Sequence, residues 1–345
     1  MIAGMPLPLP VRRLIIIVAL AAGAIGSAGA QRVRSRLPAS DGWVDKTPHK
    51  AGFVTVQRGV RIHYLDFGGT GPPLLLVPGI GNTAHAYDDF APALTDRFHV
   101  YAMTRRGFGE SSHPSTGYDI PRLTLDIRTV MDSLHLTVVE LVGHSFAGQE
   151  LTHFARTYPT RVHKLVYLDG AFDTYAVDSV SHTIFPEAMP YPSKAPLTDA
   201  DTSTYRAYVK YVHSSRGVSI PESDIRARVK YDGIVEELGV GYQGIDAEAG
   251  VEAQHWETLK QPALAIFAVR DSARQSEPWI VADTASWPDV QAVLNKSMIV
   301  NQFAVADFKR APHGEALVIH GGHHWVFVSH RDTVLTAVRE FLLRP

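Results

Sequence analysis

A single serine at an abrupt strand-to-helix boundary is the first residue in this sequence that suggests chemistry. Residues 141–150 read LVGHSFAGQE: an apolar run ends at Gly143, Ser145 follows, and a helical pattern begins at once. A Gly-x-Ser-x-Gly pattern between a strand and a helix holds a serine hydroxyl out as a nucleophile. The fifth motif position is Ala147 here, which is small enough for the same turn. The alternative is that Ser145 only caps the helix that follows.

A serine hydroxyl is a weak nucleophile near neutral pH, so it needs a base and an acid that orients the base. With this motif the partners follow in the order Ser, Asp or Glu, His. Asp271 comes just after the apolar run 263–269, and His324 follows the run 316–319. Both positions suit a catalytic triad, because active sites of open α/β sheets lie at the carboxyl ends of the strands. We therefore predict Ser145, Asp271 and His324 as the catalytic residues.

Two alternatives remain for the partners of the serine. Asp169 follows another apolar run and is the second candidate for the acid, after Asp271; its other interpretation is a cap or turn residue. His323 is the second candidate for the base. We favour His324, whose distance from the final helix suits a loop histidine directed back at the sheet edge.

The histidines after the last apolar run also raise the possibility of a zinc site. His320, His323 and His324 are close in sequence, but a catalytic zinc ion needs about three converging protein ligands. Adjacent residues of an extended segment point in opposite directions, so His323 and His324 do not converge. The chain has no cysteine, which excludes thiolate catalysis and disulfides. We predict no metal and no cofactor.

Two backbone amides are candidates for stabilising an oxyanion. Phe146 follows the serine at a helix N-terminus, where developing negative charge is favoured. The other candidate is the amide of Ile80 in the segment LLLVPGIG, where Gly79 permits a close backbone approach. Each such donor contributes about 2.7–4 kcal/mol in the transition state. No Gly-Lys-Ser/Thr follows, so this is not a phosphate-binding loop.

Composition restricts the class of partner. The 345 residues are 45% hydrophobic and 20% charged, with a net charge of −2, which is typical of a globular protein. No basic stripe is visible, so a nucleic-acid partner is not expected. We predict a small-molecule substrate with an ester-like carbonyl as a partner, and no stable membrane partner once the N-terminal segment is removed.

The N-terminus has the pattern of a secretory signal peptide. Arg12 and Arg13 precede the uncharged run 14–25, and small residues follow up to Ala30. The apolar run is shorter than the ~20 residues that span a bilayer. We predict cleavage after Ala30 and export to the periplasm or beyond; an uncleaved membrane anchor is the alternative.

Beyond a polar lead-in at 31–50, strand and helix patterns alternate, as in a mostly parallel, helix-covered sheet. We expect a hairpin from 53–56 and 60–64, strands at 74–77, 99–103, 138–142, 164–168, 263–269 and 316–319, and helices at 122–135, 149–157, within 286–309 and near the C-terminus. The alternation breaks between 172 and 260, which predicts an inserted cap. The core then comprises residues 51–171 and 261–345.

With these residues in hand, the sequence from about 53 to 343, apart from the cap, resembles the α/β-hydrolase superfamily. The matching segments are GHSFAG, LLLVPGIG, TRRGFGESSHP (104–114), RVHKLVYLDGAF (161–172) and GGHHWVFVSHRDTVLTAVREFL (321–342). The resemblance implies the triad and oxyanion donors predicted above, although some relatives place the acid where Asp169 stands. The usual His-Gly before the oxyanion loop is Pro78-Gly79 here. Epoxide hydrolases and haloalkane dehalogenases of this fold carry Asp at the elbow, and Ser145 argues against both.

The resulting hypothesis is an exported serine hydrolase that cleaves carboxylic esters through an acyl-enzyme on Ser145, without a cofactor. The cap at 172–260 would select the substrate. Relatives of the same fold also cleave aminoacyl amides, lactones and carbon–carbon bonds, so these activities remain alternatives. A ligand-binding protein that kept the fold and lost turnover is the alternative outside enzymes.

Overall fold

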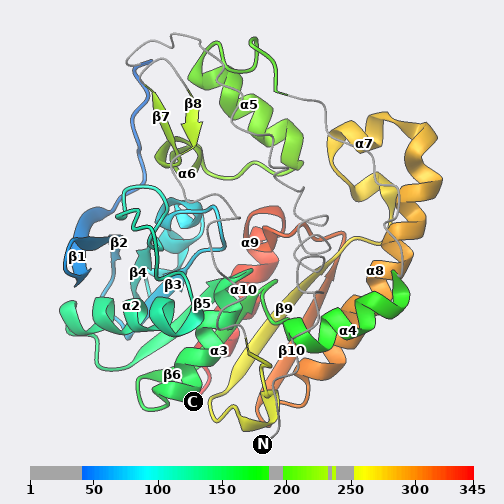
Figure 1. Ribbon diagram of the computed structural model, residues 1–345. Helices are drawn as coiled ribbons and strands as arrows, with labels where there is room; N and C mark the ends of the chain where they lie inside the picture. Colours follow the sequence, from blue (N-terminus) through cyan, green and yellow to red (C-terminus); the bar gives the residue numbers. More distant parts are fainter. Residues whose placement is uncertain (1–40, 186–196, 232–234, 238–251) are drawn as a thin grey trace, which may run out of the picture.

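The computed structural model describes residues 41–185, 197–231, 235–237 and 252–345 (Figure 1). The predicted signal peptide lies outside the described residues, as does the lead-in up to residue 40. Three parts of the predicted cap, residues 186–196, 232–234 and 238–251, are outside them as well. Among the helices that are described, none is long and apolar enough to span a bilayer.

A central sheet of eight strands, in the order β1-β2-β4-β3-β5-β6-β9-β10, organises the fold. β1 pairs antiparallel with β2, and β2 with β4, while every other neighbouring pair is parallel. The strands are β1 (Lys50–Gln57), β2 (Val60–Gly68), β3 (Pro73–Val77), β4 (His99–Met103), β5 (Val139–His144), β6 (Val162–Leu168), β9 (Ala263–Val269) and β10 (Gly314–His320). The predicted mostly parallel α/β sheet is thereby confirmed.

Alternate side chains of the sheet feed two separate cores. On β3, Leu74 and Leu76 join one apolar cluster, and Leu75 and Val77 join the other, as the period of two in a strand requires. Both faces of the strand are buried, which explains its continuous apolar sequence. The first cluster includes α10 (Arg331–Leu343) and the short 3-10 helices η1 (Ala84–Tyr87) and η2 (Ala91–Leu94); the second includes α2 (Ile120–Ser133), α3 (Ala147–Thr157) and α8 (Trp287–Phe308).

Local signals explain where several helices begin. Asp119 caps α2, its side chain accepting a hydrogen bond from the amide of Arg122, and Pro121 stands in the first turn. The predicted strands and helices of the core are present with ends shifted by a few residues. The largest shift near the serine is that of α3, which begins at Ala147, two residues before the predicted start at 149.

Between β6 and β9, the described residues form helices and a small hairpin, and none of them adds a strand to the central sheet. Figure 1 shows α5, α6 and the β7–β8 pair grouped together beyond one end of the sheet strands. Asp224 of α6 anchors this group to the core: its carboxylate accepts hydrogen bonds from Asn82 Nδ2 at 2.8 Å and the Thr83 amide at 2.7 Å. The elements are α4 (Thr174–Ile184), α5 (Tyr205–Arg216), α6 (Glu222–Ala227), β7 (Val229–Tyr231) and β8 (Val235–Glu237), and α7 (Pro278–Ala282) and α9 (Val326–Ser329) follow later.

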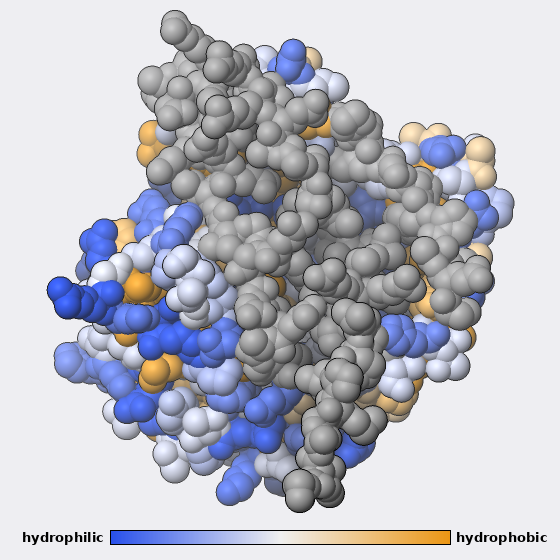
Figure 2. Space-filling model, viewed as in Figure 1, coloured by the Kyte–Doolittle hydropathy of each residue, from blue (hydrophilic) through white to orange (hydrophobic). Residues whose placement is uncertain are grey.

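On the face in view, the surface over β1, β2 and α2 is mainly hydrophilic (Figure 2). Apolar residues there are scattered among hydrophilic ones, as on an ordinary solvent-facing surface.

Candidate active site

Ser145 stands at a strained corner between β5 and α3. Its φ is +55°, a left-handed conformation that is uncommon for a residue with a side chain and clusters at functional sites. The corner is crowded: a Cβ on Gly143 would lie 2.7 Å from Leu151 Cδ1, and one on Gly148 only 1.8 Å from the carbonyl oxygen of Gly170. Glycines at these two positions therefore allow the strand, the helix and the next loop to meet around the serine.

His324 brings its ring to the serine hydroxyl. Nε2 of His324 lies 2.8 Å from Ser145 Oγ, and Nδ1 lies 2.7 Å from Asp169 Oδ2. Since the carboxylate can only accept, Nδ1 carries the proton and Nε2 presents its lone pair to the hydroxyl. The contact predicted between Ser145 and His324 is present.

The acid in this row is Asp169, and the prediction of Asp271 is wrong. Asp271 Oδ2 instead accepts from Nδ1 of His320 at 3.0 Å, in a pair whose side chains are 34% and 69% exposed. Asp169 follows β6, next to the strand of the serine, whereas Asp271 follows β9, next to the strand β10 that ends at His320. Each carboxylate meets a different histidine: Asp169 meets His324 in front of Ser145, and Asp271 meets His320 at the end of β10.

Asp169 is held by more than its histidine. Its second oxygen, Oδ1, accepts from the amide of Ala268 at 2.9 Å, and its own amide donates to Ile266 O at 2.7 Å. The residue is buried and has a φ of +46°, so it is a second strained residue at the ends of the strands. Both carboxylate oxygens are thus fixed, and the carboxylate cannot rotate away from the imidazole of His324.

The other two histidines of the final segment face elsewhere. His320 ends β10, as expected, and His323 donates from Nε2 to the carbonyl of Arg216 at 2.6 Å while its ring stacks on Trp325. Burial, together with the nearby charge of Arg270, lowers the pKa of His323 well below its usual range. His323 is therefore a neutral link to the end of α5, and the three histidines do not converge on one ion.

His144, just before the serine, is a positioning residue that sequence reasoning missed. It is fully buried, and its Nε2 donates to the carbonyl of His324 at 2.9 Å. Burial, reinforced by the neighbouring His324, lowers the pKa of His144 well below the ordinary value, so the ring stays neutral. Its neutral N–H secures the backbone of the histidine that contacts the hydroxyl.

The loop after β3 approaches the serine from the other side. A Cβ on Gly79 would lie 2.8 Å from Nδ1 of His144 and 3.0 Å from the Cβ of Ser145, so only glycine fits there without displacement. The side chains of Ile80 and Phe146 both pack against a small apolar cluster formed by Phe108 and Tyr118. Ile80 and Phe146, the two predicted oxyanion donors, directly follow Gly79 and Ser145, the residues that make this close approach. Neither amide donates a hydrogen bond to another residue of the described chain.

A buried ion pair orients this loop. Arg105 donates from Nε and Nη2 to the two carboxylate oxygens of Glu150 at 2.6 and 2.7 Å, and also to the carbonyls of Pro78 at 2.8 Å and Gly79 at 3.3 Å. The peptide bond after Gly79 is trans, so the amide of Ile80 points away from the guanidinium. Sequence reasoning missed this ion pair. The signal that could have revealed it is the pair Arg105 and Arg106 shortly after a buried strand, because a buried arginine requires a carboxylate partner.

The matches to known proteins agree with this architecture. Residues 72–219 match the family model described as the alpha/beta hydrolase fold. The E-2-(acetamidomethylene)succinate hydrolase structure aligns with a TM-score of 0.59 and 20% identity, over 85% of this chain and 99% of that one. Carboxylesterase CesB from Bacillus subtilis aligns with a TM-score of 0.54 and 14% identity, over 86% and 92%. Residues 72–219 thus match the α/β-hydrolase family, and the described chain has the α/β-hydrolase fold.

Among curated proteins, the chain is similar to a soluble epoxide hydrolase from Corynebacterium sp. (strain C12). The two are 33% identical over 111 residues, which is 32% of this chain and 38% of the relative. The mouse bifunctional epoxide hydrolase 2 is 32% identical over 124 residues, or 35% of this chain and 22% of its own length. The chain thus spans well under half the length of the curated relatives that it matches, and the particular reaction must be argued from the site.

Proposed function

We propose that this α/β hydrolase cleaves carboxylic esters through an acyl-enzyme on Ser145. The observation that carries the proposal is the hydrogen-bonded row from the hydroxyl of Ser145 through His324 to Asp169, at 2.8 and 2.7 Å. Nucleophile, base and orienting acid each occupy the position that acyl transfer by a serine requires. Ser145 and His324 are the nucleophile and the base that the sequence predicted, and Asp169 is the acid.

In the proposed reaction, His324 accepts the hydroxyl proton as Ser145 Oγ attacks the ester carbonyl. The tetrahedral oxyanion is stabilised by the amides of Ile80 and Phe146, and Asp169 stabilises the imidazolium that forms. His324 then protonates the leaving alcohol, and the C–O bond breaks to leave the acyl-serine. Water, deprotonated by the same histidine, hydrolyses the acyl-serine and regenerates the hydroxyl.

The nucleophile favours esters over epoxides, although the matched curated relatives are epoxide hydrolases. A carboxylate nucleophile that opens an epoxide forms an ester, which water hydrolyses. A serine that opened an epoxide would form an ether, which a triad of this kind cannot hydrolyse, and the enzyme would stop after one turnover. Ser145 therefore supports acyl transfer.

We further propose that the protein is exported and that the segment between β6 and β9 selects the acyl and alcohol groups. Export rests on the N-terminal pattern ending at Ala30. Selection rests on position, because this segment reaches the site through the contact of Arg216 with His323, the neighbour of His324. Lactones, aminoacyl amides and carbon–carbon bonds are the competing substrate classes.

A fluorophosphonate probe tests whether Ser145 is activated. We expect stoichiometric labelling of the native protein and none of Ser145→Ala, compared at equal folded fraction by circular dichroism. Chromogenic esters, lactones, aminoacyl amides and an epoxide would then be assayed with both proteins. Absence of labelling in the folded native protein would contradict the proposed function and favour a ligand-binding protein that kept the fold.

A further inference from the structure

A second cluster of ionisable side chains lies apart from Ser145, where the N-terminal segment contacts the loop after β3. Asp45 and His49 come from that segment, and His85 comes from η1. Each of the three is partly buried, and one ligand atom from each lies within 4.8 Å of the others. Asp45 and His85 are 40 positions apart in the sequence. Together with His49, they thus present two imidazoles and a carboxylate to a common point.

The spacing in this cluster is close to that of ligands around a metal ion. One ligand atom from each of Asp45, His49 and His85 lies within 4.8 Å of the other two. Ligand atoms at about 2.1 Å from one tetrahedral ion are about 3.4 Å apart, and no two ligands of one ion exceed about 4.2 Å. Small rotations of side chains therefore suffice to close the three ligand atoms around a cation.

Buried polar atoms without a partner point to a ligand here. His49 Nδ1 and Asp45 Oδ2 are buried and make no hydrogen bond within the described chain, although Asp45 Oδ2 lies 3.3 Å from His85 Nδ1 in an ion pair. Asp88 adjoins them: it is only 3% exposed, its Oδ2 lies 2.9 Å from His85 Nδ1, and its Oδ1 is also unpartnered. Leaving such atoms unsatisfied is unfavourable, and a divalent cation would satisfy them while balancing two neighbouring carboxylates.

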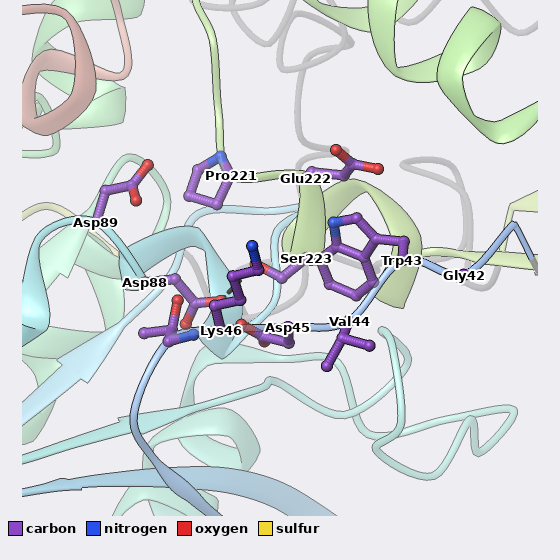
Figure 3. Close-up of a pocket in the computed structure, with 11 residues that line it drawn as sticks. Gly42, Trp43, Val44, Asp45, Lys46, Asp88, Asp89, Pro221, Glu222 and Ser223 are labelled. Carbon is purple, nitrogen blue, oxygen red and sulfur yellow. Dashed lines mark hydrogen bonds between the residues drawn. The ribbon is translucent and has the colours of Figure 1, made fainter.

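The cluster is open to solvent through a pocket. A cavity of about 490 Å³ is lined by Asp45 and Asp88 together with residues of the N-terminal segment and of α6, including Ser223. Figure 3 shows Asp45, Asp88 and Ser223 around this cavity, with the side chain of Lys46 beside them. The hydroxyl of Ser223 donates to Asp88 Oδ2. An ion thus has an entry path, and the buried carboxylate of Asp88 is already oriented.

We propose that Asp45, His49 and His85 bind a divalent transition-metal cation of the zinc type, His85 through Nε2, with Asp88 as the carboxylate that accepts from Nδ1 of His85 and orients its ring. Two imidazoles and a carboxylate are a zinc ligand set, whereas calcium and magnesium prefer oxygen ligands only. A carboxylate beside a ligating histidine is the usual outer-shell partner. The ion fastens the N-terminal segment to η1, next to Asn82 and Thr83, which hold α6.

Zinc binding to the full chain, stripped with a chelator, tests this site directly. We expect one Zn²⁺ per chain by elemental analysis and competition titration, and a higher melting temperature with Zn²⁺ than without. Asp45→Asn and His49→Ala should each weaken binding at least about 100-fold, and Asp88→Asn about 10- to 100-fold. His320→Ala, which removes an exposed histidine from a carboxylate pair, is the matched control and should bind zinc normally.

Asp45→Asn preserves the shape of a partly exposed side chain, so its metal-free melting curve should match that of the native protein. The proposal is overturned if the native protein takes up no zinc, or if Asp45→Asn and His49→Ala bind it as tightly as the native protein. Loss of the ion in His320→Ala would assign it to the surface pair instead. A Ca²⁺ response equal to that of Zn²⁺ would also overturn the assignment.

Discussion

Two histidine–aspartate pairs lie at the carboxyl ends of neighbouring strands, and they differ chiefly in burial. Asp169 and His324 are 8% and 5% exposed and meet at 2.7 Å, whereas Asp271 and His320 are 34% and 69% exposed and meet at 3.0 Å. Only the first pair reaches a serine hydroxyl. The second has the same residue types after a strand and no nucleophile in contact.

The difference shows that residue type and strand-end position do not by themselves make a catalytic pair. The buried carboxylate accepts from a backbone amide as well as from its histidine, so its orientation is set. The exposed pair is surrounded by water, where such a contact contributes little. The comparison can be tested by changing matched residues in both pairs.

The largest difference should come from the histidines. His324→Gln removes the base and should lower kcat by about 10⁵- to 10⁶-fold on whichever ester the native protein hydrolyses. His320→Gln should change kcat less than twofold. Steady-state kinetics with a chromogenic ester measures both. Comparable losses in the two variants would contradict the assignment of the base.

The aspartates should differ by a smaller factor. Asp169→Asn leaves the shape intact but removes the charge and favours the wrong tautomer of His324, so kcat should fall about 10⁴-fold. Asp271→Asn should stay within twofold of the native protein. If the loss instead followed Asp271→Asn, the acid would belong to the next strand and the active conformation would differ from the one described.

The buried ion pair should affect both stability and rate. Arg105→Met leaves Glu150 unpaired and should lower the free energy of unfolding by about 3–5 kcal/mol. It should also lower kcat by about 10²- to 10³-fold, the effect of losing one oxyanion donor, because the carbonyls of Pro78 and Gly79 lose their donor. The exposed Arg344–Glu315 pair is the control, and Arg344→Met should cost at most about 1 kcal/mol.

A double variant separates these two effects of the ion pair. Arg105→Met with Glu150→Leu should recover most of the lost stability, since no unpaired charge stays buried. It should not recover kcat if Arg105 positions the loop. Recovery of both by the double variant would leave Arg105 a purely structural role.

The smallest effect concerns the pH dependence of stability. Burial lowers the pKa of His323 in the folded chain, so below pH about 6.5 the unfolded chain binds a proton that the folded chain does not. The free energy of unfolding should therefore fall as the pH is lowered, by up to about 1.4 kcal/mol per pH unit for this group. His144 acts in the same direction.

Urea unfolding at pH 7 and pH 5.5 measures this dependence. His323→Gln keeps a donor for the carbonyl of Arg216 and should reduce the loss of stability on acidification. His320→Gln, at an exposed position, should leave it unchanged. Equal slopes for the native protein and His323→Gln would show that His323 is protonated in the folded state.

The sequence alone was sufficient for the parts of this site that depend on local chemistry. The strand, glycine, serine and helix around Ser145 follow one another within a few residues, so the corner was predictable from the pattern. His324 was preferred over His323 because its distance from the final helix suits a loop histidine directed back at the sheet edge, and the two histidines do make hydrogen bonds to different partners. The apolar runs likewise predicted the sheet.

Only the tertiary structure decided which carboxylate serves the histidine. Asp169 and Asp271 each follow an apolar strand, and nothing local distinguishes them, because the choice depends on which histidine each carboxylate meets in the folded chain. The pairing of Arg105 with Glu150 and the meeting of Asp45 and His49 with His85 are also long-range contacts. Local sequence specifies a turn or a strand through the conformations that neighbouring residues allow, whereas contacts between distant residues are set by how the whole sheet and its covering helices pack.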